Sequence, residues 1–149
     1  MKGKPVNILL VEDEPAHAEI VRRNFEISHL ANRLMHVADG QAALDYLFRT
    51  GEFGDSDKFP MPDLILLDLR LPRVDGLEVL KTIKSDENLR RIPVVILTTS
   101  AVEADKLKAY ERNANSYLVK PVDFPKFVAL MESLNYYWLA WNRYPYTLA

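Results

Sequence analysis

The sequence predicts an α/β fold in which helices cover both faces of a doubly wound, five-stranded parallel sheet. Short apolar runs rich in Val, Ile and Leu alternate along the chain with longer segments of helical periodicity. Three of the runs, ILLV, LILL and VVIL, contain no polar residue, which is typical of strands that are buried on both sides. Parallel strands need crossover helices between them, so this alternation predicts five strands and five helices around one sheet.

The expected strands are short, and the expected helices repeat apolar residues at a spacing of three or four. Strands are expected at residues 6–11, 33–37, 64–67, 94–97 and 117–119. Helical periodicity is clear in residues 15–27, 76–84 and 123–134. The apolar faces of these helices consist of Ile20, Val21 and Phe25 in the first, Leu77, Leu80 and Ile83 in the second, and Phe127, Leu130, Met131 and Leu134 in the third.

Length and composition indicate one globular domain. The chain has 149 residues, of which 48% are hydrophobic and 27% charged, enough for a single core. Its net charge of −2 supplies no general attraction to nucleic acid or to an anionic membrane. The absence of cysteine excludes thiol catalysis and Cys-ligated zinc, and is compatible with a reducing compartment. The N-terminus lacks the apolar core of a signal peptide and no segment is long enough to span a membrane, so we expect a cytoplasmic protein.

Polar side chains follow the apolar runs at the points where the strands should end. The carboxyl ends of parallel strands meet at one edge of a sheet, where open α/β folds bind their ligands. Any one of these polar residues, taken singly, is explained better as a solvated loop residue or a helix cap. That explanation is weak for all of them together, which favours a ligand site. These residues are Glu12 and Asp13 after the first strand, Asp68 after the third, Thr98 and Thr99 after the fourth, and Lys120, followed by Pro121, after the fifth.

The central residue of this group is Asp68, which ends an apolar run and precedes Leu69, so that its burial requires a partner. Neighbouring carboxylates repel one another, so either a pKa rises or a cation binds. A small site of oxygen ligands with open positions suits Mg²⁺ better than Ca²⁺. A metal, a lysine and a hydroxyl around an aspartate favour phosphoryl transfer onto that aspartate. Asp68 would be the nucleophile, Mg²⁺ and Lys120 would neutralise the phosphoryl oxygens, and the Thr98 hydroxyl would bond one of them.

Four stretches of the chain resemble the signature blocks of the response-regulator receiver domain. They are ILLVEDE, LILLDLRLPRVDG, VVILTTS and YLVKP. Their spacing agrees with the family, with 98 − 68 = 30 residues from Asp68 to Thr98 and 120 − 98 = 22 from Thr98 to Lys120. The resemblance covers roughly residues 5 to 134 and implies a flavodoxin-like sheet with strand order 2-1-3-4-5.

The resemblance also implies roles for individual residues. The chain would be a phosphoacceptor that assists its own phosphotransfer and autodephosphorylation, and not an enzyme with a separate substrate. Phosphate would draw the Thr98 hydroxyl inward and Tyr117 would follow, which changes the face formed by the fourth helix, fifth strand and fifth helix. The implied roles are phosphoacceptor for Asp68, direct metal ligand for Asp13, ligand largely through metal-bound water for Glu12, backbone-carbonyl ligand for Arg70, switch pair for Thr98 and Tyr117, and a cis peptide bond between Lys120 and Pro121.

Three features depart from the family pattern. Thr99 stands where the family has a very small residue, which would alter access to the phosphoryl group. Asn113 replaces the glycine that commonly ends the fourth helix, and Asn is the next best residue for a left-handed cap. The insertion TGEFGDSDKFPMP, residues 50–62, lengthens the connection into the third strand. With LTTS and the aromatic tail, it makes the chain resemble the stand-alone response regulators that partner cyanobacterial phytochromes.

Residues 135–149, which follow the expected fifth helix, are rich in aromatic side chains and nearly devoid of basic charge. They are too short for a DNA-binding module. An aromatic cluster must be covered, either by its own domain or by another chain. We expect a homodimer through the tail and the face of the fourth helix, fifth strand and fifth helix, and a histidine kinase, specifically a phytochrome, as the phosphodonor. The aromatic residues of the tail are Tyr136, Tyr137, Trp138, Trp141, Tyr144 and Tyr146.

Other functions are less compatible with these residues. A haloacid-dehalogenase phosphatase needs a second acid where Arg70 stands, and a flavodoxin needs a hydroxyl-rich loop where EDEPAHAE stands. Neither glycine pattern of nucleotide-binding loops occurs. A receiver-shaped interaction module that does not turn over phosphate remains the alternative. The histidines, His17, His29 and His36, are dispersed; His17 alone falls near the rim, and surface or capping roles are expected for all three.

Overall fold

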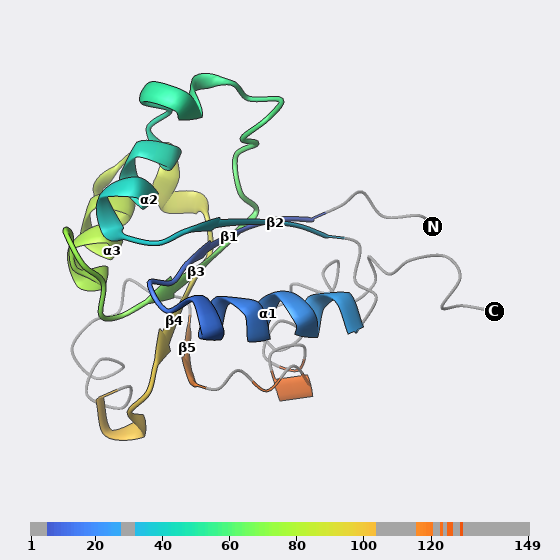
Figure 1. Cartoon of the computed structure of the whole chain (residues 1–149). Helices are drawn as coiled ribbons and strands as arrows, with labels where there is room; N and C mark the ends of the chain where they lie inside the picture. The colour runs from blue at the N-terminus through green and yellow to red at the C-terminus, as the bar shows by residue number, and fades with distance from the viewer. Residues whose placement is uncertain are drawn as a thin grey trace.

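The computed structural model, which describes residues 6–27, 32–103, 116–120, 123, 125–126 and 129, contains a five-stranded parallel sheet (Figure 1). The strand order is β2-β1-β3-β4-β5, as predicted. The strands are β1 (Val6–Val11), β2 (Asn32–Val37), β3 (Leu64–Asp68), β4 (Val94–Thr98) and β5 (Ser116–Val119). Between them lie the helices α1 (Pro15–Ile27), α2 (Gly40–Leu47) and α3 (Gly76–Ser85), and the short 3-10 turns η1 (Gly51–Gly54) and η2 (Leu89–Arg91).

The core has two layers because successive strand residues point to opposite faces of the sheet. Helix α1 covers one face, and α2 and α3 cover the other (Figure 1). Beneath α1, the buried residues Ala18, Val21 and Phe25 pack on Ile8, Leu10, Leu64, Leu66, Val95 and Leu97. On the other face, Tyr46, Leu47, Val79, Leu80 and Ile83 pack on Leu9, Val11, Ile65, Leu67, Val94 and Ile96.

Helix α1 differs from the prediction in which residues it buries. Ile20 is 42% exposed, whereas Val21 and Phe25 are 4% and 3% exposed. The buried stripe is Ala18, Val21 and Phe25, at spacings of three and four, and Ile20 lies about 100° around the helix from its neighbour Val21. The expectation that Ile20 shares the core face is therefore wrong.

Residues 50–62, the insertion before β3, form an ordered layer against α2 (Figure 1). The Tyr46 hydroxyl donates to the Pro60 carbonyl at 2.7 Å, and the Tyr46 ring lies 5.2 Å from Phe53 and 5.8 Å from Phe59 between ring centroids. Tyr46 is 1% exposed. The insertion thus adds a small aromatic cluster on the α2 side of the sheet.

The loop between β3 and α3 is held close to the sheet by two glycines. A Cβ atom on Gly76 would lie 2.3 Å from the Asp68 carbonyl oxygen, and one on Gly40 would lie 1.8 Å from the Val74 carbonyl oxygen. The Gly40 N–H also donates to the Pro72 carbonyl at 3.3 Å. The position of this loop therefore depends on the absence of side chains at both glycines.

Replacement of Gly40 by alanine should destabilise the protein by about 3 kcal/mol, because a methyl group at 1.8 Å from a backbone oxygen forces the loop outward. Urea unfolding would measure the loss. Gly54→Ala is the matched control, since its Cβ would meet the Arg49 carbonyl oxygen at an ordinary 3.7 Å. Equal unfolding midpoints for the two variants would contradict the proposed packing.

Several predictions concern residues outside the described part of the chain. Residues 101–103 are helical where the fourth helix is expected, and Pro125, Lys126 and Ala129 are helical within the fifth. The rest of these two helices is not described, nor are His29, Asn113, Pro121 and the tail residues Tyr136, Tyr137, Trp138, Trp141, Tyr144 and Tyr146. Among the described helices, none has the length and apolar character needed to cross a membrane.

Candidate functional site

The carboxyl ends of the strands bring the predicted polar residues together in a cleft of about 210 Å³, here called the Asp68 cleft. Parallel pairing explains this, since β1, β3, β4 and β5 all end at the same edge. The cleft is lined by Glu12, Asp13, Glu14, His17, Asp68, Leu69, Arg70, Thr98, Thr99 and Lys120.

An acidic cluster forms one wall of the Asp68 cleft. Glu12, Asp13 and Asp68 each place a carboxylate oxygen within 4.8 Å of the others. Glu12 is fully buried and Asp68 is 6% exposed, whereas Asp13 is exposed. The cluster therefore opens to solvent on the Asp13 side, where a hydrated ion would enter.

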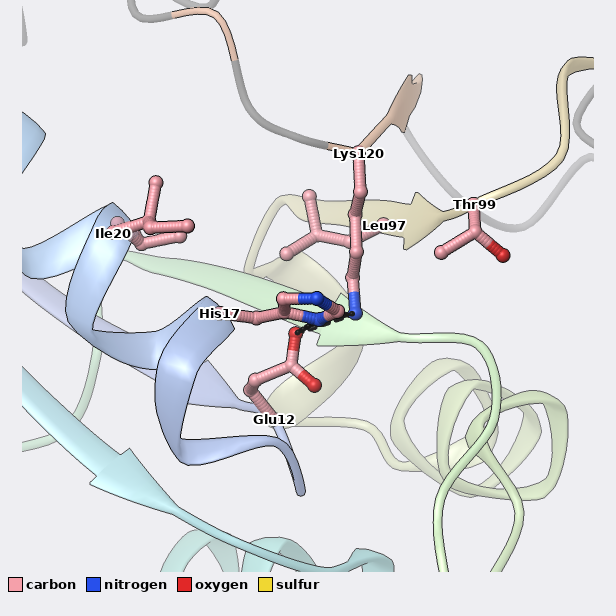
Figure 2. Close-up of a pocket in the computed structure, with 7 residues that line it drawn as sticks. Glu12, His17, Ile20, Leu97, Thr99 and Lys120 are labelled. Carbon is pink, nitrogen blue, oxygen red and sulfur yellow. Dashed lines mark hydrogen bonds and ion pairs between the residues drawn. The ribbon is translucent and has the colours of Figure 1, made fainter.

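Lys120 follows the end of β5 and extends toward Glu12 of this cluster (Figure 2). Its ammonium lies 2.5 Å from Glu12 Oε1 and 2.9 Å from Asp68 Oδ2. The Lys120 side chain is 7% exposed, so burial opposes its charge, but the two carboxylates outweigh burial and raise its pKa. Lys120 is therefore a permanent cation in the cleft.

Both oxygens of Asp68 have partners, which answers how this carboxylate is accommodated in the core. Oδ1 accepts the Arg70 backbone N–H at 3.2 Å, and Oδ2 accepts from Lys120 Nζ. A buried carboxylate is tolerated when an opposite charge and hydrogen bonds compensate its lost hydration. The contacts orient the Asp68 carboxylate at the floor of the cleft.

The Glu12 carboxyl group has a raised pKa in the folded chain. Burial, followed by the adjacent Asp68 carboxylate, raises its pKa from 4.5 to about 7, although Lys120 acts in the opposite direction. Its Oε2 accepts the Glu14 N–H at 3.2 Å. The charged form of Glu12 is therefore disfavoured in the folded chain even with the ammonium in place.

This shift predicts a pH-dependent stability. A carboxyl group with a higher pKa in the folded chain stabilises it fully below pH 4.5, and this stabilisation is lost as the pH rises toward about 7. Between pH 4.5 and about 7, the free energy of unfolding of the unchanged chain should fall by roughly 1–3 kcal/mol more than that of Glu12→Gln. Urea unfolding in the presence of EDTA would measure both. Parallel pH profiles for the two proteins would contradict the assignment of the shift to Glu12.

The residues expected to form a switch lie on adjacent strands. Thr98 is 4% exposed, and its hydroxyl accepts the Ser100 N–H at 3.2 Å. Tyr117 is 8% exposed and belongs to the core cluster on the α2 and α3 side. Thr99 is exposed at the mouth of the cleft. The switch roles of Thr98 and Tyr117 stay predictions.

The structure also shows side-chain contacts of His17 and Arg70 that sequence reasoning did not predict. His17 Nδ1 lies 3.4 Å from Lys120 Nζ and 3.8 Å from Glu12 Oε1. The Arg70 guanidinium, on a residue that lines the cleft, donates to Glu103 at 3.1 Å. The position of His17 one helical turn after Asp13 was the available signal, whereas the Arg70–Glu103 pair joins residues 33 apart and left no local signal.

A second cavity of about 300 Å³, here called the apolar pocket, adjoins the Asp68 cleft (Figure 2). It is lined by Glu12, His17, Ile20, Val21, Leu97, Thr99 and Lys120. Since His17 and Lys120 line both cavities, they form part of the boundary between them.

The donor set fits a hard divalent cation. The acidic cluster contains three carboxyl groups, and the Lys120 ammonium contacts two of them, Glu12 and Asp68. Oxygen donors with an open, solvent-facing side suit Mg²⁺, which keeps several of its waters.

The chain is similar to known proteins over most of its length. Residues 8–132 match the family described as the response regulator receiver domain. The chain is 50% identical over 141 residues to the probable methanogenesis regulatory protein FilR2 of Methanothrix harundinacea, covering 95% of this chain and 88% of that protein. It is 42% identical over 135 residues to the response regulator Rcp1 of Synechocystis, covering 91% and 90%.

Solved structures show the same fold. The bacteriophytochrome response regulator RtBRR has a TM-score of 0.79 and 48% identity, covering 87% of this chain and 78% of that chain. The Mn²⁺-bound form of Rcp1 has a TM-score of 0.71 and 41% identity, covering 91% and 95%. The phosphorylated cyanobacterial phytochrome response regulator RcpA has a TM-score of 0.73 and 37% identity, covering 95% and 99%. A sensor-kinase receiver domain from Pseudomonas aeruginosa, with magnesium coordinated in its active-site cleft, has a TM-score of 0.69 and 30% identity, covering 88% and 98%.

Proposed function

The chain belongs to the response regulator receiver family, and from that premise we propose that it accepts a phosphoryl group on Asp68 from a histidine kinase. The observation that carries the proposal is the contact of the Asp68 carboxylate with Lys120 inside the acidic cluster. An aspartate with a purely structural role needs one compensating cation, and Lys120 supplies it. The acidic cluster holds two further carboxyl groups, which suit a second, divalent cation.

In the proposed step, a carboxylate oxygen of Asp68 attacks the phosphorus of a phosphohistidine. The P–N bond breaks, its electron pair returns to the imidazole nitrogen, and an acyl phosphate forms. Lys120 neutralises a phosphoryl oxygen and the Thr98 hydroxyl donates to another. Glu12, Asp13, Asp68 and the Arg70 carbonyl would hold Mg²⁺, which would supply further positive charge for the phosphoryl oxygens. Water that attacks the phosphorus later regenerates the carboxylate, which is the proposed autodephosphorylation.

The proposed output is a changed protein-interaction face. Movement of Thr98 toward the phosphoryl group would let Tyr117 follow, and β5 and the two helices beside it would rearrange. Register supports the coupling, because Thr98 pairs with Val119, two residues beyond Tyr117 on β5. The absence of cysteine is compatible with a cytoplasmic location for this exchange.

The test of the proposal is phosphotransfer. Incubation with acetyl phosphate and Mg²⁺ should add one acid-labile phosphoryl group, and EDTA should prevent it. Candidate histidine kinases would then be compared as donors, with phytochrome kinases first, because RtBRR and RcpA are named as phytochrome response regulators. Complete failure to incorporate phosphate would favour the alternative, an interaction module of receiver shape without turnover.

Dimerisation through the output face and the tail is a further part of the proposal. Val102 and Val119, on the described part of that face, are 68% and 42% exposed. With residues 5–134 as the receiver unit, the full chain should sediment as a dimer and a form ending at Ser133 as a monomer. Equal masses for both forms would remove the proposed interface.

A further inference from the structure

Three acceptor atoms surround the Lys120 ammonium within the part of the chain that the structure describes. Glu12 Oε1 lies at 2.5 Å and His17 Nδ1 at 3.4 Å (Figure 2). Asp68 Oδ2 lies at 2.9 Å. A lysine ammonium has three N–H donors and no acceptor. With 7% of the Lys120 side chain exposed, these three atoms match its three donors.

The three acceptors differ in what else they are required to bind. Glu12 and Asp68 belong to the acidic cluster that suits a divalent cation. His17 lies outside that cluster, and its contact with an ammonium requires a lone pair on Nδ1, which assigns the ring proton to Nε2. A bound cation would compete with Lys120 for Glu12 and Asp68. Among the described partners of Lys120, His17 is therefore the neutral acceptor that would stay in contact with its ammonium.

We infer that His17 is a positioning residue that holds the Lys120 ammonium beside Asp68 during phosphotransfer. When Glu12 turns toward a cation, Lys120 loses its shortest contact, and His17 keeps the ammonium at the cleft. The inference rests on the proposed function and assigns a role to a residue on α1.

The surroundings of His17 give this contact a fixed geometry. The ring lies in the first turn of α1, and the buried residues Ala18 and Val21 fix that turn against the sheet. Beyond His17 the apolar pocket presents the hydrocarbon side chains of Ile20, Val21 and Leu97. A lysine released from His17 would therefore lose a polar partner and face an apolar wall.

Two variants of similar volume test the inference. His17→Asn places an amide oxygen near the position of Nδ1, whereas His17→Leu removes the acceptor. At saturating acetyl phosphate and Mg²⁺, the Leu variant should be phosphorylated on the order of tenfold more slowly, and the Asn variant should stay within about twofold of the unchanged chain. The half-saturating concentration of acetyl phosphate should not change. In a Lys120→Met background, His17→Leu should cause no further loss.

A second readout does not depend on phosphorylation. The protein would be labelled with ¹⁵N at lysine Nζ and loaded with Mg²⁺. The protected ammonium resonance of Lys120 is assigned by its absence from Lys120→Met. This resonance should persist in His17→Asn and disappear in His17→Leu. A Leu variant that keeps both the resonance and the rate overturns the inference, as does an Asn variant impaired as strongly as Leu. Failure of the unchanged chain to incorporate phosphate would instead overturn the proposed function, and the resonance comparison would still decide the role of His17.

Discussion

Asp68→Asn should reduce acid-labile phosphate incorporation from acetyl phosphate or a phosphorylated kinase to background. An amide oxygen is a far weaker nucleophile than a carboxylate and cannot form an acyl phosphate. The fold should persist, because the Asn side chain has nearly the same shape and its one amide oxygen can still accept from either the Arg70 N–H or Lys120. Mass spectrometry of the intact protein, beside a radiolabel assay, would measure the loss.

Asp63→Asn is the matched control. Asp63 stands at the other end of the same apolar run, is exposed, and accepts the Asn7 backbone N–H at 2.9 Å. This variant should be labelled like the unchanged chain. Undiminished phosphate on Asp68→Asn would refute the assignment of the nucleophile.

Lys120→Met should change two properties in opposite directions. Mg²⁺ should bind on the order of tenfold more tightly, because the ammonium and the cation compete for Glu12 and Asp68. Phosphotransfer should nevertheless slow by about 100-fold, since a charge beside the transferred phosphoryl group is lost. Calorimetric titration with Mg²⁺ and single-turnover labelling would measure the two effects.

Lys84→Met is the control for loss of a partly buried lysine. Lys84 donates to the Arg90 and Ile92 carbonyls at 3.1 Å and 2.9 Å, beside η2, and burial lowers its pKa. Its removal should lower stability and leave Mg²⁺ affinity unchanged. Weaker Mg²⁺ binding by Lys120→Met would show that the lysine supports the metal site instead of competing with it.

The sheet could be predicted from the sequence because each strand is a self-contained apolar run. Residues 64–67, for example, are all apolar, so a strand formed by them must be covered on both faces of the sheet. The structure places this strand, β3, in the middle of the sheet. The rim residues were also predictable, because parallel strands bring their ends to one edge. The outward position of Ile20 was not, because Ile20 and Val21 are adjacent and equally apolar.

The features that sequence reasoning missed depend on three-dimensional packing. His17 meets Lys120 over 103 residues of chain, and this contact depends on where α1 lies against β5. Glu12 was expected to act on the metal largely through metal-bound water, and sequence reasoning did not predict that it is fully buried with Lys120 and His17 beside it. The family resemblance supplied roles for Glu12 and Lys120 but gave none for His17.

The aromatic layer formed by Tyr46, Phe53 and Phe59 has a consequence for how this chain can vary. It anchors the 50–62 segment on the face of the sheet opposite α1, and residues 54–58 are exposed. Residues can therefore be gained or lost at that tip without reaching the chemistry around Asp68. A fluorescent reporter or an affinity tag placed there would leave the Asp68 cleft accessible.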